Sequence, residues 1–364
     1  PLTRNETAMK KADPNFMPVY QQIGQYWGDQ PGTSGPVYVG AFVMMLFILG
    51  LFIVKGGIKW ALLAATILSI LLSWGHNFMP FTNFFLDYVP MYAKFRTVAS
   101  ILVIAEFTIP LLAMMALKKI IDEPEILNKK LKFVYISFGL TAGFCLLFLV
   151  MPGLFFSDFI SAQEMQAFRQ IPQEYLSQML PNLRAMREAM FDADCWRSFI
   201  IIAIGTLMLL LFKAKKLKET WLVAGIIILC GVDMWGVNKR YLHDDMFVEA
   251  SVKDTPITMT ESDKQILQDK GLDYRVLNLA SNTFNENETS YYHKSIGGYH
   301  PAKLRRYQEL IDYHIAPEMR AMMGAIAEAG GDMTKVNGDS IWPVLNMLNT
   351  KYVIMPLQKC RRYI

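Results

Sequence analysis

The sequence predicts an α-helical polytopic membrane protein with six transmembrane helices, followed by an extracytoplasmic α+β domain. Six apolar stretches lie in the first two-thirds of the 364 residues, and 53% of all residues are hydrophobic, a high share for a soluble protein. Lysines are concentrated in alternate loops between the stretches, whereas residues 239–364 have ordinary polarity. These observations divide the chain into a membrane part and a water-exposed part.

Most of the apolar stretches are long enough for a helix that crosses a membrane, which takes about 20 residues. The fifth stretch is short, but Cys195 and Trp196 can extend it while Arg197 reaches outward to the interface. The predicted spans are 37–54, 58–74, 98–117, 133–151, 199–212 and 221–237.

The distribution of lysines predicts the orientation. The longer connections 76–97 and 152–197 contain few cations. Because cytoplasmic loops carry an excess of Lys and Arg, the lysine-rich loops are predicted to face the cytoplasm. The net charge of +4 comes from these loops and does not indicate nucleic-acid binding. Their lysines follow the first, third and fifth stretches: Lys55, Lys59, Lys118, Lys119, Lys129, Lys130, Lys132, Lys213, Lys215, Lys216 and Lys218.

Three regions follow from this topology. Residues 1–36 form an outer N-terminal segment, residues 37–238 form the transmembrane domain, and residues 239–364 form the extracytoplasmic domain. The sequence begins with Pro1 and has no signal peptide, so we expect it to be part of a longer protein and the last domain to be truncated.

The two outer connections have different predicted structures. Residues 76–97 are rich in aromatic residues and contain two prolines, so this loop should lie at the interface or dip into it rather than cross. Residues 152–197 contain two segments with apolar residues at helical spacing, EMQAFRQI and LPNLRAMREAMF. These segments predict one or two amphipathic helices on the outer surface.

The pattern after Lys239 is that of a water-soluble domain with helices and strands. Thr260 or Ser262 can cap the first of its helices. The predicted elements are a helix at 261–271, a strand at 273–280, a helix at 302–315 and a buried strand at 351–355.

The sequence lacks the motifs of several enzyme classes. There is no P-loop, no G-x-G-x-x-G and no H-E-x-x-H, so nucleotide hydrolysis, dinucleotide redox chemistry and a zinc site are not supported. Cys145 and Cys230 lie inside spans, and the pair Cys195 and Cys360 forms a conceivable but disfavoured disulfide. No metal and no cofactor are predicted.

Two carboxylates lie within the predicted spans. Glu106 is the ninth residue of its stretch, near the middle of the membrane, where a charge costs about 2.5–3.5 kcal/mol on insertion scales. It either lines a cleft or is a protonated or helix-pairing structural carboxyl. Asp233 lies about 6 Å from the outer end of its span. It either lines the same cleft or, as we favour, bonds Asn238 or Trp235 at the interface.

Cations lie at the outer mouth of the third span. Lys94 and Arg96 flank Phe95 below the aromatic loop, at headgroup depth. Arg offers a bidentate fork to phosphate oxygens, so this pair is a candidate site for a lipid phosphate. The alternative is that the two cations only anchor the helix. His76 and Asp87 in the same loop are weak evidence for a titratable pair.

The segment GGYHPAKLRRY at 297–307 combines aromatic and cationic residues. Carbohydrate sites need flat aromatic faces and hydrogen-bonding side chains, which Tyr299, His300 and Arg305 would supply together with Tyr291 and Tyr292. The favoured alternative is a glycine turn that leads into a helix with a solvated basic face.

Several separated segments, in this order, resemble the YfhO family of bacterial membrane proteins, in a Bacteroidetes-like version. They are YWGDQPGTSGPVYVGA, MYAKFRT, VDMWGVNKRYL, YRVLN, GGYHPAKLRRYQ and VLNMLNTKYVI, and they cover most of the chain. The resemblance implies similarity to GT-C-type glycosyltransferases, which take a sugar from a polyprenyl-phosphate carrier on the outer face of the bacterial inner membrane. The acidic catalytic residue of that architecture lies near the start of the protein, in a region with no match here, so no catalytic residue is assigned.

Two function classes remain. The first is a transferase that moves a sugar from a polyprenyl-phosphate donor to a polymer or lipid acceptor of the cell envelope. The second is a transporter or flippase for a lipid or polymer, with Glu106 in its path. A transporter should show paired broken helices or repeated halves, and the sequence shows neither.

Overall fold

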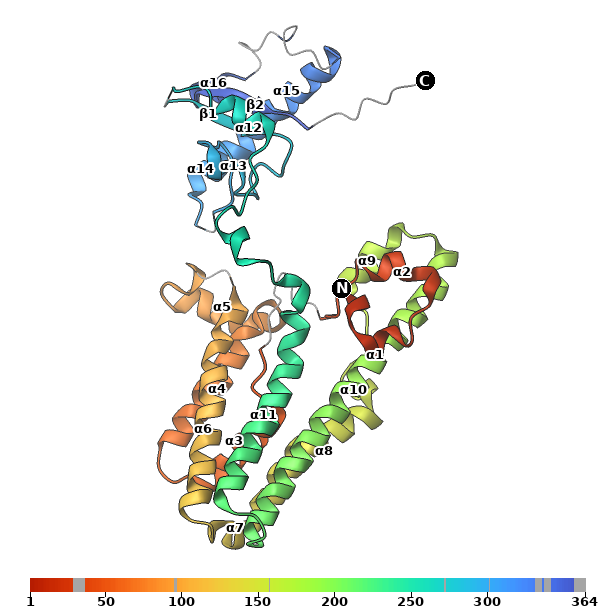
Figure 1. Ribbon diagram of the computed structural model, residues 1–364, viewed down its shortest axis with the longest axis vertical. Helices are drawn as coiled ribbons and strands as arrows, with labels where there is room; N and C mark the ends of the chain where they lie inside the picture. The colour runs from red at the N-terminus through yellow and green to blue at the C-terminus, as the bar shows by residue number, and fades with distance from the viewer. Residues whose placement is uncertain are drawn as a thin grey trace. The chain divides into compact units, whose positions relative to one another are not determined.

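The computed structural model describes residues 1–28, 37–94, 97–156, 158–271, 273–300, 302–330, 336 and 342–356. Its chain forms two compact units, Pro1–Met246 and Phe247–Ile364. The first unit contains the long helices, and the second contains short helices around a small sheet (Figure 1).

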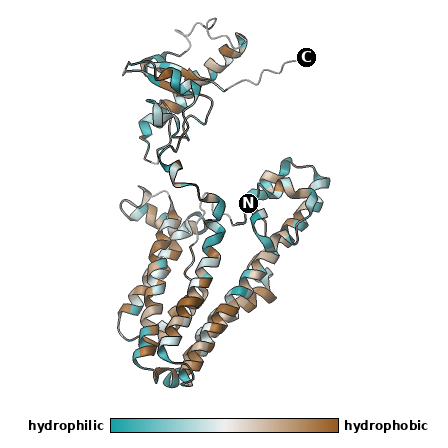
Figure 2. Cartoon of the chain, in the orientation of Figure 1, coloured by the Kyte–Doolittle hydropathy of each residue, from teal (hydrophilic) through white to brown (hydrophobic). Residues whose placement is uncertain are grey.

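Several helices of the first unit are long and apolar enough to cross a membrane. Among the described residues four segments pass by length and composition, and a fifth passes if the bent pair Ile58–Ser73 and Gly75–Tyr88 forms one span. Figure 2 shows the apolar residues along these helices and the polar residues at their ends. The protein is therefore a mostly helical, multi-pass membrane protein. The four segments are Val98–Asp122, Leu131–Val150, Gln173–Lys213 and Glu219–Tyr241.

The first predicted span is helical over only part of its length. Helix α3 covers Ala41–Ile53, and Gly40 before it has φ +96°, a conformation that favours glycine. Residues 37–40 therefore approach the helix in a non-helical conformation. The 13 residues of α3 extend about 20 Å, less than the hydrocarbon core of about 30 Å.

The second span ends in a sharp turn. Helix α4 covers Ile58–Ser73, and the following segment Gly75–Tyr88 is bent away by 106°. That segment consists of the short turn η3 (Gly75–Phe78) and helix α5 (Met79–Tyr88). The bend agrees with the prediction that residues 76–97 do not continue the span.

Helices α6 and α8 form the third and fourth spans. A 3₁₀ turn, η5 (Val98–Leu102), precedes α6 (Val103–Asp122), which continues beyond the predicted end at Leu117. Buried Ile120 keeps the last turn on the core, and Lys118 pairs with Asp122 at 2.9 Å. The short helix α7 (Ile126–Lys129) leads into α8 (Leu131–Val150).

Helix α10 joins two elements that the sequence analysis separated. It runs without interruption over Gln173–Lys213, so the predicted amphipathic helix and the fifth span form one helix. No Gly or Pro lies between residues 182 and 204 to break it. Its 41 residues extend about 60 Å, so about half of it reaches beyond a hydrocarbon core. Helix α11 (Glu219–Tyr241) follows.

The part of α10 before the span carries a small subdomain. Helices α1 (Glu6–Met9), α2 (Met17–Tyr20) and α9 (Ala162–Ala167) pack on it. Arg187 of α10 is fully buried and donates to Glu164 Oε1 at 2.6 Å and to the carbonyls of Phe159 and Gly24 at 2.7 and 3.1 Å. One arginine therefore fastens three segments of the chain together. The core of this subdomain contains Leu2, Phe16, Tyr20, Met179, Leu183 and Met186.

Helix α3 lies at the centre of the bundle core. A Cβ on Gly50 would lie 2.9 Å from Leu112 of α6, and one on Gly205 would lie 2.3 Å from the ring of Phe42. These glycines allow close helix contacts, as small residues do in membrane proteins. In Figure 1, α8 and α10 run together and diverge from α4, α6 and α11 away from α7.

The lysine-rich loops gather at one end of the bundle. The ammonium groups of Lys59 and Lys130 donate to the carbonyls of Leu51 and Phe52, each at 2.7 Å. These carbonyls belong to the last turn of α3, where cations are favourable. The residues that start α3 lie at the opposite end.

The second unit contains short helices and a small two-stranded sheet. Strands β1 (Arg275–Asn278) and β2 (Thr350–Ile354) pair in parallel, inside or close to the two predicted strands. Helix α12 (Glu261–Ile266) is shorter than predicted, and Thr260 caps it in a capping box with Asp263.

The second predicted helix of this unit is longer than expected. Helix α14 (Arg305–Leu310) continues through a π-helical turn (Ile311–Ile315) into α15 (Ala316–Glu328). The unit also contains the 3₁₀ turn η9 (Ala250–Lys253) and the short helices α13 (Thr289–Tyr292) and α16 (Pro343–Met347). Its core contains Leu277, Ile296, Ile311, Ile315, Met322 and Leu345.

Candidate functional site

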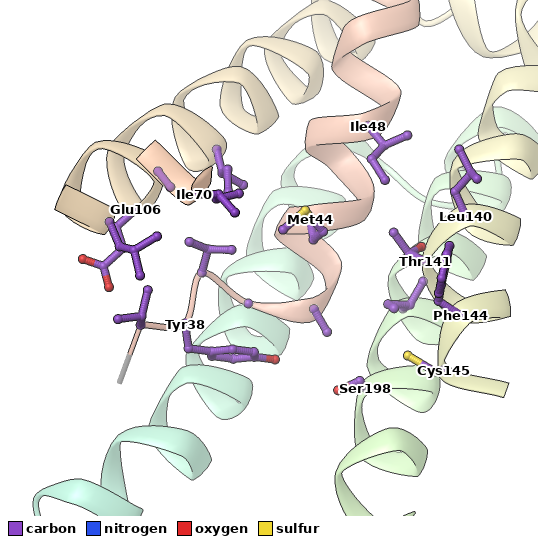
Figure 3. A pocket seen from close by; sticks show the side chains of 18 residues that line it. Tyr38, Met44, Ile48, Ile70, Glu106, Leu140, Thr141, Phe144, Cys145 and Ser198 are labelled. Carbon is purple, nitrogen blue, oxygen red and sulfur yellow. The ribbon is translucent and has the colours of Figure 1, made fainter. Parts of the chain in front are cut away.

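An apolar cavity of about 420 Å³ lies within the helix bundle. Residues 37–41 and side chains from α3, α4, α6, α8 and α10 line it. In Figure 3, Met44 and Ile48 of α3 lie between Glu106 on one side and the residues of α8 on the other. The lining is mostly aliphatic and aromatic, which suits a hydrocarbon chain. Its apolar side chains include Met44, Ile48, Ile109, Leu140, Phe144 and Ile202.

Few polar groups reach this cavity. Thr141 of α8 donates to the carbonyl of Ser137 at 2.8 Å, so its hydroxyl is occupied within its own helix. Cys145 of α8 and Ser198 of α10 also line the cavity. The ring of Tyr38 points toward these two residues (Figure 3). The lining is therefore polar mainly where residues 37–41 approach the bundle.

Glu106 lines the cavity but lies nearer a helix end than predicted. It belongs to the first turn of α6, because regular α-helix starts only at Val103 and continues to Asp122. A carboxylate in a first turn is favoured by the helix dipole. Its side chain is half-buried, and among the described residues it has no hydrogen bond or ion pair.

Asp233 is buried and holds the start of α3. Its carboxylate accepts hydrogen bonds from the Tyr38 hydroxyl at 2.8 Å and from the Ala41 backbone N–H at 2.9 Å. It is only 2% exposed. The prediction that it bonds Asn238 or Trp235 was wrong, because α3 starts beside α11 and offers a free N–H.

Arg197 lies beside Asp233 with donors still free. Its Nη1 is 3.9 Å from Asp233 Oδ1 and its Nε is 3.8 Å from Asp194 Oδ1, both beyond hydrogen-bond distance. Asp194 instead accepts from Arg240 Nη1 at 2.6 Å. Nε and Nη1 of Arg197 are buried and have no hydrogen-bond partner within the described residues.

A guanidinium with free donors can bind an anion. Arg197 also stacks over Tyr38, with its Cζ 5.5 Å from the ring centroid, and the next residue, Ser198, lines the cavity. A phosphate with an attached hydrocarbon chain needs both features, a bidentate cation and an apolar space. We call Arg197, Tyr38 and Asp233 the rim cluster. This cluster provides a cation next to the apolar cavity.

Sequence reasoning missed the rim cluster. It treated Arg197 only as a cation that reaches outward from the extended fifth span to the interface, and it did not consider Tyr38. The sequence did contain one signal. Arg197 and Asp233 have opposite charges, and both lie near the predicted outer ends of the fifth and sixth apolar stretches. Such charges within a membrane protein commonly pair.

The predicted phosphate pair is only partly described. Arg96 and the side chain of Lys94 lie outside the described residues, while the backbone of Lys94 ends a 3₁₀ turn (Tyr92–Lys94). Their role remains a prediction from the sequence.

The predicted sugar-binding residues lie on the surface of the second unit. Tyr299 is 54% exposed, and the Arg305 side chain, which is 92% exposed, donates to Glu309 at 2.9 Å. His300 is also exposed, and its Nδ1 accepts from the backbone of Ala302 at 3.1 Å. Gly298, with φ +108°, makes the turn before them. These residues therefore form a glycine turn followed by a helix with a solvated basic face, which was the alternative to a sugar-binding site.

Among the described residues, no group of three His, Cys, Asp or Glu side chains could hold a metal ion. Cys145, Cys195 and Cys230 are free thiols, and Cys360 lies outside the described residues.

Comparison with known proteins adds no relative. No family model, no curated protein and no solved structure matches the chain.

Proposed function

We propose that the protein is a membrane glycosyltransferase that moves a sugar from a polyprenyl-phosphate donor to an acceptor of the cell envelope. The observation that carries the proposal is the apolar cavity with the rim cluster beside it. Sugar transfer, rather than another use of a lipid phosphate, is supported by the segments that resemble the YfhO family.

Each part of such a donor has a matching feature. The isoprenoid chain would occupy the cavity, where burial of apolar surface contributes about 25 cal/mol per Å². The phosphate would accept from the exposed edge of the Arg197 guanidinium, because the side chain is 26% exposed and makes no hydrogen bond within the described residues. Lys94 and Arg96 are proposed as further phosphate contacts, and Tyr299, His300 and Arg305 as acceptor contacts.

The chemistry requires stabilisation of the leaving phosphate and removal of a proton from the acceptor hydroxyl. A guanidinium hydrogen-bonded to the phosphate stabilises the charge that develops as the sugar leaves. Tyr38 and Asp233 would hold Arg197 in place, because one stacks on it and the other attracts its charge. No general base is assigned to the described residues.

The proposed orientation places the cavity in the outer half of the membrane. The lysine-rich loops gather at the C-terminal end of α3 and would face the cytoplasm. The cavity is lined by Tyr38, Gly40 and Met44 from the other end of that segment. A donor in the outer leaflet of the bacterial inner membrane would then meet the cavity at its own depth.

One observation favours a carrier as the second candidate. Glu106 lines the cavity and has no partner within the described residues, as expected for a group on a transport path. In a carrier, the lipid or polymer itself would cross the membrane without transfer of a sugar.

The full-length protein in liposomes, supplied with a radiolabelled polyprenyl-phosphate sugar and a cell-envelope extract, tests the proposal. We expect wild type to label the acceptor, Arg197→Gln to lose transfer at equal folding, and Arg169→Gln, a change at an exposed arginine away from the cavity, to keep it. If wild type transfers no sugar but moves the lipid across the vesicle membrane, the carrier replaces the transferase.

A further inference from the structure

We infer that α5 and its flanking turns form an anchor that lies along the headgroup–acyl boundary of the bilayer. The anchor comprises residues 74–92, and its partner is the lipid surface itself. The inference uses the direction of α5, its uncovered side chains and its continuity with α4. It does not depend on the proposed enzymatic activity.

The direction of α5 follows from the turn after α4. Helix α4 packs along α6, which is long and apolar enough to span the membrane, and the segment after α4 is bent from it by 106°. A helix nearly perpendicular to a span runs along the membrane plane. Gly75 has φ +50° at the bend, and the Thr82 hydroxyl donates to its carbonyl at 2.7 Å.

The anchor maintains its shape through its own aromatic rings. Phe78 and Phe81 stack at 5.5 Å, Phe81 and Phe85 lie 5.0 Å apart, and Phe85 and Tyr92 lie 5.5 Å apart. This row occupies one set of side chains and leaves a second set uncovered. The uncovered side chains are Met79, Phe84, Leu86, Tyr88 and Met91, with exposed fractions of 43%, 54%, 42%, 74% and 69%.

The chemistry of this surface fits a lipid interface. Within Met79–Tyr88 the only charged residue is Asp87, so the helix offers no cation for a nucleic acid or an acidic peptide. Aromatic rings and methionine beside polar Asn83 suit the boundary between headgroups and acyl chains. A water-facing surface of this composition would be costly.

The uncovered surface continues from a surface that faces lipid. Ile67 and Leu68 of α4 are 47% and 44% exposed, and Trp74 at the bend is 47% exposed. Because α4 packs along the α6 span, such residues would contact acyl chains. Apolar exposure therefore runs from the span into the anchor, with the tryptophan at the depth where interfacial aromatic residues concentrate.

Spin labels placed in the full chain test this inference. A cysteine-free background receives Phe84→Cys or Tyr88→Cys, with Ile67→Cys and Ser290→Cys as controls for hydrocarbon and water. The proteins are reconstituted in nanodiscs of phosphatidylethanolamine and phosphatidylglycerol. The collision rates of each label with oxygen and with a water-soluble nickel complex then give its depth.

We expect labels 84 and 88 to lie about 5–10 Å below the headgroup surface, between the two controls. Nickel accessibility equal to that at position 290 would overturn the inference, because α5 would then face water. Depth equal to that at position 67 would also overturn it and indicate a re-entrant loop. Protection from both reagents would show that protein covers the surface instead. Because all four positions are exposed or face lipid, unfolding temperatures should match wild type.

Discussion

The guanidinium of Arg197 stacks over the ring of Tyr38, with its Cζ 5.5 Å from the ring centroid, and the hydroxyl of that ring donates to Asp233 at 2.8 Å. These residues come from α10, from the segment before α3, and from α11. The contact therefore joins three parts of the bundle beside the cavity. The stability of the bundle and the position of the cation should depend on the same few side chains.

Loss of the Asp233 carboxylate should destabilise the bundle. Asp233→Ala leaves the Tyr38 hydroxyl and the Ala41 N–H without their acceptor. An unsatisfied buried group costs about 1–3 kcal/mol, so with two such groups we expect the free energy of unfolding to fall by about 2–6 kcal/mol. Reversible denaturation in detergent measures this change. Asp244→Ala, at a side chain that is 88% exposed, is the control and should have almost no effect. Equal stabilities of the two variants would contradict the cap role of Asp233.

Arg187 should be essential for the subdomain on α10. Arg187→Ala leaves Glu164 and two backbone carbonyls without their donor, and disruption of a buried charge pair costs about 3–5 kcal/mol. We expect rapid proteolysis of residues 1–28 in the variant. The matched change Arg184→Ala affects a pair with Asp158 that is partly exposed, so protection should be largely retained. Unchanged proteolysis after Arg187→Ala would show that the apolar core alone holds the subdomain.

Acid should weaken the second unit through Asp269. A hydrogen bond from Lys351, with others from the Gly271 N–H and the Tyr352 hydroxyl, lowers the pKa of Asp269 from 3.8 to about 2. A lowered folded-state pKa stabilises the fold above the unfolded value, and this contribution is lost as the pH falls through the folded value. The difference in unfolding midpoint between wild type and Asp269→Asn should therefore shrink between about pH 4 and pH 2.

Scanning calorimetry of the full chain at several pH values measures this difference. Lys351→Met removes the main cause of the low pKa, so in that background the effect of Asp269→Asn should be smaller and should change less between about pH 4 and pH 2. A difference that stays constant from pH 6 to pH 2 would contradict the assigned pKa shift.

Cysteine labelling should establish the orientation. Positions 125 and 290 are both exposed, one between α6 and α7 and the other in the second unit. In a cysteine-free background, a membrane-impermeant maleimide added to spheroplasts should label Ser290→Cys, while Glu125→Cys should react only after the membrane is opened. Equal labelling of both positions would overturn the orientation.

The sequence predicts best what depends on neighbouring residues. The sequence offered Thr260 or Ser262 as the cap of α12, and Thr260 is the cap; the two strands follow from an alternating segment and a short apolar run. The bend after α4 could be anticipated only in part, because a glycine and a proline in an aromatic loop do not fix an angle.

Contacts between distant segments could not be predicted in the same way. Tyr38 and Asp233 are 195 residues apart, and only the packing of α3 against α11 brings them together. The continuity of α10 was missed because a change from amphipathic to apolar pattern was interpreted as a boundary, although no helix breaker lies there. A cation at the end of a predicted span is usually an interfacial residue. Arg197 was therefore assigned to the interface rather than to a binding site.

Direct binding of polyprenyl phosphate is the most decisive measurement for the proposed site. The full chain in nanodiscs is titrated with radiolabelled polyprenyl phosphate, and wild type is compared with Arg197→Gln and with the exposed control Arg169→Gln. A lost charged hydrogen bond costs about 1.5–3 kcal/mol, so Arg197→Gln should raise Kd about 10-fold or more, while the control stays within about twofold of wild type. Equal Kd values for wild type and Arg197→Gln, or no binding to wild type, would contradict the assignment of the rim cluster and its cavity to a lipid phosphate.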